Sequence, residues 1–160
     1  MNVETSRRHS TVRARHAGFS LVELLVLVGI LGILTTISVP FFIRYYQAAA
    51  VKAAAEEVAT FLNQGRQIAI KENQSVCASI DNNAMHYHMT NCGGTVWLGP
   101  GTDTAGNIRI PAGFTLTTTA EPIFSYLGAA APAATFTVRH TPSGRQITVT
   151  VTGSGRVTIP

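Results

Sequence analysis

The chain has 160 residues, of which 46% are hydrophobic and only 12% are charged, and its formal net charge at pH 7 is +4. This length allows one small domain with an added segment, and the low charged fraction excludes an ordinary soluble domain over the whole chain. The basic charge is concentrated in residues 1–18, where four arginines and one glutamate give a net +3. The remaining eight basic and seven acidic residues are nearly balanced, which argues against a general nucleic-acid-binding class.

A long apolar segment, residues 19–42, follows the basic one. As a helix it would span about 36 Å, whereas the hydrocarbon core of a bilayer is about 30 Å thick. The basic flank is expected to stay in the cytoplasm, so the pattern predicts a single-pass inner-membrane protein with a periplasmic C-terminal domain.

Two simpler membrane classes fit this segment less well. A secretory signal peptide has a shorter apolar run with small residues after it, whereas Ala17 and Gly18 precede the run here. An ordinary anchor leaves Glu23 unexplained, because a carboxylate within the apolar stretch costs at least about 2.5–3.5 kcal/mol. We therefore expect a functional partner for Glu23; the alternative is that its side chain extends from a shallow position to the lipid headgroups.

The stretch Gly-Phe-Ser-Leu-Val-Glu-Leu-Leu, residues 18–25, resembles the prepilin cleavage and methylation motif. The resemblance implies that a prepilin peptidase cuts between Gly18 and Phe19, removes residues 1–18 as a leader, and N-methylates Phe19. It also implies that Glu23 pairs with the N-terminal amine of a neighbouring subunit during assembly, and that helix 19–42 serves as both transmembrane segment and filament core. Pro40 falls where many members of this family have a proline.

The helix is predicted to continue to residue 72 and to enter the periplasmic domain, residues 43–160. Apolar residues repeat there at steps of three and four, which is typical of one buried helical face. They are Val51, Ala54, Ala55, Val58, Phe61, Leu62, Gly65, Ile68 and Ala69. The sequence Asn73-Gln74-Ser75 is expected to end the helix.

From Val76 onward, short runs of β-branched and aromatic residues alternate with turn residues, which favours strands within a β-sheet over residues 76–159. The expected strands are 76–80, 84–89, 95–98, 113–119, 134–140, 145–151 and 155–159. Residues 98–111 and 127–134 are expected to be loops. The predicted fold class is therefore α+β and pilin-like: a long helix, whose second half packs on a C-terminal antiparallel β domain.

Cys77 and Cys92 are the only cysteines. Because disulfide bonds persist in the periplasm, we expect these two residues to be bonded, which closes a loop of about 15 residues and contributes roughly 3 kcal/mol. A metal site with His86 and His88 is the alternative, but the spacing matches no common structural zinc pattern. We expect no metal and no cofactor, and we interpret the two histidines as a solvated strand face.

The β part of the chain resembles the GspH/FimT group of minor pseudopilins and minor pilins. The resemblance rests on Cys77 with Cys92, Trp97-Leu98-Gly99, Phe136-Thr137-Val138 and Gly155-Arg156-Val157. It implies a structural subunit of a type II secretion pseudopilus that lies near the filament tip and acts with other pilin or pseudopilin subunits. The partners expected are those subunits, the prepilin peptidase and inner-membrane lipid.

The alternative function is a type IV pilus minor pilin of FimT type that binds DNA for uptake. Some members of that group bind through a Gly-Arg-x-Arg motif, but Thr158 replaces the second arginine here. The candidate DNA contacts are Arg139, Arg145 and Arg156, which are expected to form a small patch on the last strands and make a weak electrostatic footprint. No constellation of catalytic residues and no phosphate-binding loop is evident, so neither an enzyme nor a small-molecule substrate is expected.

Overall fold

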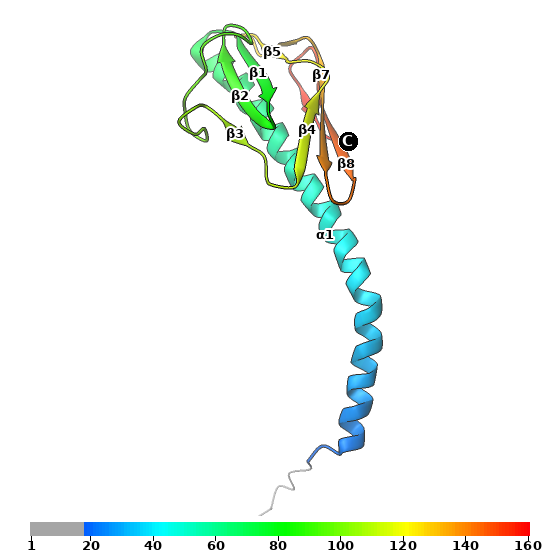
Figure 1. Ribbon diagram of the computed structural model, residues 1–160. Coiled ribbons are helices and arrows are strands. Elements are labelled where there is room, and N and C mark those ends of the chain that lie inside the picture. The colour runs from blue at the N-terminus through cyan, green and yellow to red at the C-terminus, as the bar shows by residue number, and fades with distance from the viewer. Residues whose placement is uncertain (1–17) are drawn as a thin grey trace, which may run out of the picture. The chain divides into compact units, whose positions relative to one another are not determined.

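A computed structural model describes residues 18–160, so the predicted leader lies outside the described residues except for Gly18. One helix precedes nine strands in the described part of the chain, and all paired strands are antiparallel (Figure 1). The predicted α+β class is therefore confirmed. The chain divides into two compact units, one ending at Pro40 and the other comprising Phe41–Pro160.

Helix α1, Leu21–Glu72, begins two residues later than expected and ends as predicted. Its end is a left-handed cap in which Asn73 adopts a φ of 50°. The backbone N–H of Gln74 then donates to the carbonyl oxygen of Ala69 at 3.2 Å, which satisfies one of the last free carbonyls of the helix. Asparagine tolerates this conformation better than most residues, which explains why the helix stops there.

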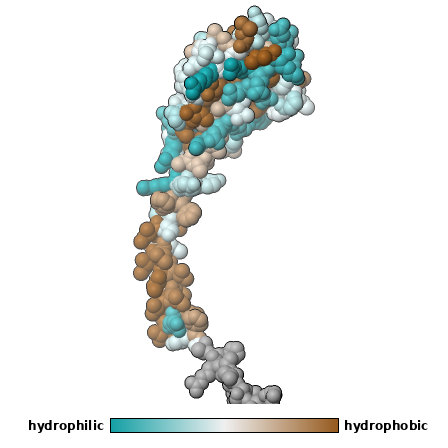
Figure 2. Space-filling model, turned by 180° about the vertical axis from the view of Figure 1, so that it is seen from behind, coloured by the Kyte–Doolittle hydropathy of each residue, from teal (hydrophilic) through white to brown (hydrophobic). Residues whose placement is uncertain are grey.

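The first part of α1, Leu21–Pro40, is exposed along its whole length. The face of this segment seen in Figure 2 is mostly hydrophobic, with a hydrophilic spot near the N-terminal end. The hydroxyl groups of Thr35, Thr36 and Ser38 donate to helix carbonyls three or four residues earlier, at 2.7–2.9 Å. These hydroxyl groups are thus hydrogen-bonded within the helix itself and need no partner from the surroundings, as an apolar medium requires. The helix is long and apolar enough to cross a membrane.

The first sheet has five strands in the order β3-β2-β1-β5-β6. They are β3 (Ile108–Arg109), β2 (Ala84–Met89), β1 (Val76–Asp81), β5 (Ile123–Phe124) and β6 (Ala130–Ala131). The β1–β2 hairpin turns at Asn82 and Asn83, whose φ values of 47° and 65° match the two-residue turn that follows strand twist.

The second sheet has four strands in the order β4-β7-β8-β9. They are β4 (Phe114–Thr118), β7 (Ala134–His140), β8 (Gln146–Val151) and β9 (Val157–Thr158). Alternate residues of β7 are buried, because one face of the sheet is turned to the core and the other to solvent.

Three features differ from the sequence prediction. The residues expected to form one sheet form two, and the short strands β3, β5 and β6 were not predicted. Residues 95–98 form no strand; only Val96 makes a bridge, with His88. The following chain instead bonds to itself, since Asp103 accepts hydrogen bonds from the side chain and backbone of Asn107 and from the Ala105 N–H. The hydrogen bonds from Asn107 also hold the pKa of Asp103 below its usual range.

The helical face predicted from Val51 to Ala69 is the face that the domain buries, and every predicted member is buried. Its centre is an aromatic stack in which the rings of Phe61 and Tyr87 lie 4.5 Å apart. Gly65 makes this approach possible, because a Cβ at that position would stand 3.0 Å from the Tyr87 ring. The helix and the first sheet are therefore in direct contact at a position where glycine leaves room for the Tyr87 ring.

Asn83 connects the two sheets by hydrogen bonds. Its side-chain amide donates to the carbonyl oxygen of Phe114 at 2.9 Å, and its side-chain oxygen accepts from the N–H of Leu116 at 2.9 Å. The β1–β2 turn is thereby held against the start of β4.

Tyr87 should make the stability of the domain decrease at alkaline pH. Its buried hydroxyl donates to the carbonyl oxygen of Phe61 at 2.7 Å, and burial raises its pKa far above the usual value of about 10. The folded state therefore retains a proton that the unfolded chain loses, and stability should fall above pH 10 by about 1.4 kcal/mol per pH unit. Tyr87→Phe should reduce this dependence in urea titrations between pH 8 and 11. An unchanged slope would contradict the assignment to Tyr87.

Candidate processing and assembly sites

The predicted scissile bond, between Gly18 and Phe19, lies just before the first helical residue. Gly18, Phe19 and Ser20 are exposed and non-helical, and α1 begins at Leu21. A Cβ placed on Gly18 would meet no atom within 4 Å, and Phe19 is 73% exposed. This backbone is accessible without unwinding of α1.

Glu23 lies in the first turn of α1 and is exposed. A carboxylate at this end of a helix is favoured by the helix dipole. Two ion pairs occur among residues 18–160, Lys52 with Glu56 and Lys71 with Glu72, and neither includes Glu23. The next cation along the helix is Arg44, which is about 31 Å further on at 1.5 Å per residue. The described part of the chain thus offers Glu23 no counter-charge.

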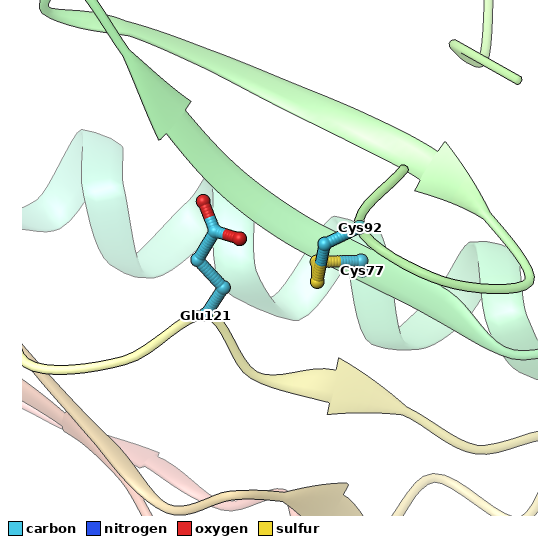
Figure 3. Close-up of side chains that lie close together, drawn as sticks. All are labelled: Cys77, Cys92 and Glu121. Atoms are coloured by element: carbon cyan, nitrogen blue, oxygen red, sulfur yellow. A yellow bond between two sulfur atoms is a disulfide. The ribbon is translucent and has the colours of Figure 1, made fainter. Parts of the chain in front are cut away.

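Cys77 and Cys92 are joined by a disulfide bond with an S–S distance of 2.01 Å (Figure 3). Cys77 is on β1 and Cys92 is in the loop after β2, so the bond ties that loop to the centre of the first sheet. The carboxylate of Glu121 lies beside it, and its oxygen and the two sulfur atoms are all within 4.8 Å of one another. These three groups could bind a metal only if the disulfide were reduced to two thiolates. The sequence spacing did not indicate that Glu121 would lie beside the two cysteines.

His86 and His88 are half-buried, so the interpretation of a solvated strand face is only partly right. The Nδ1 atom of His88 lies 3.1 Å from the carbonyl oxygen of Gly94, where a protonated Nδ1 donates a hydrogen bond. His88 therefore holds the disulfide loop in place, while the ring of His86 lines a polar cleft between the β1–β2 turn and β3.

The three arginines considered for DNA contact do not form one patch. Arg139 and Arg145 flank the β7–β8 turn, since Arg139 pairs with Gln146. Arg156 lies at the other end of β8, where Val151 pairs with Val157. Gln146 and Val151 are five residue steps apart along the strand, which places these ends about 17 Å apart.

Gly155 is a structurally demanding position that the sequence patterns did not single out as such. Its φ is +74°, and a Cβ there would stand 1.9 Å from the carbonyl oxygen of Gly128. The same oxygen accepts a hydrogen bond from Nε of Arg66 at 2.9 Å. Gly155 thus lies where the last turn, the β5–β6 loop and α1 are in contact. The side chain of the next residue, Arg156, is exposed.

Models of two known protein families match this chain, one in its N-terminal segment and one in the domain that follows. A prokaryotic N-terminal methylation motif matches residues 13–39, and the type II transport protein GspH matches residues 54–155. The minor pseudopilin EpsH from the Vibrio cholerae type 2 secretion system is 13% identical and covers 69% of this chain and 95% of its own, with a TM-score of 0.52. The type IV minor pilin FimU of Pseudomonas aeruginosa is 16% identical and covers 72% and 92%, with a TM-score of 0.49. No curated protein sequence matches the chain.

The exposed apolar helix, the antiparallel domain behind it and the methylation motif define a pilin-like protein with an N-terminal membrane anchor. Because the GspH match covers more than half of the chain, the protein belongs to the GspH family of type II transport proteins.

Proposed function

We propose that this protein is a minor pseudopilin, a membrane-anchored structural subunit of the type II secretion pseudopilus that contributes to protein secretion. The observation that carries the proposal is the GspH match over residues 54–155 behind a methylation motif at residues 13–39. Its partners are other pseudopilin subunits, and it carries out no chemistry of its own.

Processing by prepilin peptidase at Gly18–Phe19 is the first step of the proposed function. The exposed, non-helical backbone of residues 18–20 supports this, since a peptidase must bind its substrate in an accessible conformation. The peptidase cuts on the cytoplasmic side and methylates the new amine of Phe19. The mature chain then remains in the inner membrane, with residues 43–160 in the periplasm.

Assembly follows through Glu23. Glu23 lies four residues after Phe19, and its carboxylate has no cation partner among residues 18–160. The terminal amine of a neighbouring subunit supplies the missing charge, because two opposite charges cost less in lipid together than apart. The pair fixes the axial register between neighbouring helices.

A secretion assay separates this function from the pilus alternative. Deletion of the gene in its own host should leave secreted proteins in the periplasm and leave DNA uptake unchanged. The wild-type chain and an Arg156→Ala variant should both restore secretion, since Arg156 has no role in the proposal. Normal secretion with lost DNA uptake would overturn the proposal in favour of a DNA-binding minor pilin.

A further inference from the structure

One end of the Phe41–Pro160 unit is strongly basic, and it is the end at which α1 enters the domain. A groove between the β7–β8 hairpin and α1 is lined by Ala48, Val51 and Arg145. The side chain of Arg139 lies near the turn of the same hairpin, 3.9 Å from the position of a Cβ on Gly144. Arg44 precedes Ala48 by one helical turn, or about 6 Å. Arg44, Arg139 and Arg145, which we call the basic collar, thus lie at the same end of the domain.

The only acidic residue of residues 41–160 at this end is Asp81. The β1–β2 turn beside it is held to Phe114 by Asn83, and Phe114 pairs with His140 next to Arg139. Asp81 lines a cleft together with Arg109, so a basic residue shares that cleft with the carboxylate. Lys52 and Glu56 pair with each other, and Glu57 lies about 14 Å beyond Ala48 along the helix. Among the described residues, no ion pair includes Arg44, Arg139 or Arg145.

Aromatic side chains adjoin the basic collar on the side of the apolar helix. Phe41, Phe42, Tyr45 and Tyr46 are 68–74% exposed, so none of them packs on the domain. Exposed tyrosines that follow an apolar span are typical of the boundary between hydrocarbon and headgroups. The headgroup layer adds about 5–7 Å on each side of the core, and Ala48, which lines the groove with Arg145, lies about 5 Å beyond Tyr45 along α1.

We propose that the basic collar binds the phosphates of anionic phospholipids, so that the domain rests with its β7–β8 hairpin on the periplasmic leaflet before the subunit enters a filament. The inference rests on the membrane anchoring proposed above. Guanidinium groups bind phosphate oxygens in pairs, and their aliphatic stems tolerate contact with lipid. DNA also offers phosphates, but Arg156, the residue of the DNA-type motif, lies at the opposite end of β8.

The full mature chain, reconstituted in vesicles, provides the test. A Pro142→Trp substitution adds a fluorophore at the exposed β7–β8 turn, and the wild type, with only Trp97, supplies the baseline. In vesicles of phosphatidylethanolamine and phosphatidylglycerol, a headgroup nitroxide should quench the added fluorescence. Arg139→Gln with Arg145→Gln should lower the ratio of lipid-bound to free orientations by about fivefold per arginine. The paired lysine variants should retain quenching, and Arg156→Gln should leave it unchanged.

Other results would overturn the inference in distinguishable ways. The protein could float with the vesicles while the added tryptophan stays unquenched, or is quenched equally in vesicles of phosphatidylcholine alone. Either result would refute lipid binding by the basic collar and leave the membrane anchor intact. Failure of the chain to float with vesicles would refute the anchor and the collar together. Retardation of DNA that is lost in the paired glutamine variant, without lipid-dependent quenching, would reassign the arginines to nucleic acid.

Discussion

Replacement of Glu23 by alanine is expected to leave membrane insertion intact and to reduce incorporation into filaments by at least about 100-fold. Removal of the carboxylate spares up to about 3 kcal/mol of insertion cost, so anchoring should not suffer. Assembly should suffer, because the amine of a neighbouring subunit would then lie in lipid without a partner, which costs about 3–5 kcal/mol. The measurement is the ratio of sheared filament subunit to membrane-bound subunit.

Two variants control for this result. Glu23→Asp keeps the charge and should retain part of the assembly. Ser38→Ala removes a polar group elsewhere in the apolar helix, one that bonds only to the Leu34 carbonyl oxygen, and should assemble normally. Wild-type levels of filament subunit with Glu23→Ala would show that the carboxylate has no pairing role.

Replacement of Gly155 by alanine should destabilise the domain by about 3 kcal/mol or more, which corresponds to a fall in Tm of roughly 12 °C. The left-handed backbone disfavours any side chain, and the new Cβ would collide with the Gly128 carbonyl that also binds Arg66. The collision cannot be relieved by a rotamer change because the obstructing atom belongs to the backbone. Thermal unfolding of the mature chain in detergent, followed by near-ultraviolet circular dichroism, measures the effect.

Gly153 offers a matched control two residues away in the same turn. A Cβ there would have its nearest neighbour, the Ala130 carbonyl oxygen, at 3.9 Å, which is an ordinary contact. Gly153→Ala should therefore change stability by less than about 0.5 kcal/mol. Equal melting of the two variants would mean that the turn relaxes freely and that Gly155 is not a structural requirement.

The helix and the longer strands were predictable because their residues follow a clear period. The helical face from Val51 to Ala69 repeats at three and four residues, and the strand 134–140 alternates between core and solvent. The strands β3, β5 and β6 have two residues each, which is too few to show any period. Their pairing is decided by tertiary contacts, such as the hydrogen bond from the Ala130 N–H to the Gly153 carbonyl oxygen.

The candidate sites were predictable to different degrees. The cysteine pair followed from its number and the expected compartment, but Glu121 comes from a distant segment and carries no local signal. The separation of Arg145 from Arg156 was implicit in the expected strands, because a strand between them sets the two residues at its opposite ends. The requirement for glycine at position 155 depends on a contact with Gly128, which only the folded chain brings near.

Mass spectrometry of the chain after co-expression with a prepilin peptidase shows whether the peptide bond between Gly18 and Phe19 is cut. We predict a product that begins at Phe19, lacks residues 1–18 and carries one added methyl group on its terminal amine. The same experiment with a catalytically inactive peptidase should yield the uncut chain. An intact N-terminus in the presence of active peptidase, or a cut at any other bond, would show that the protein is not processed as a prepilin at Gly18.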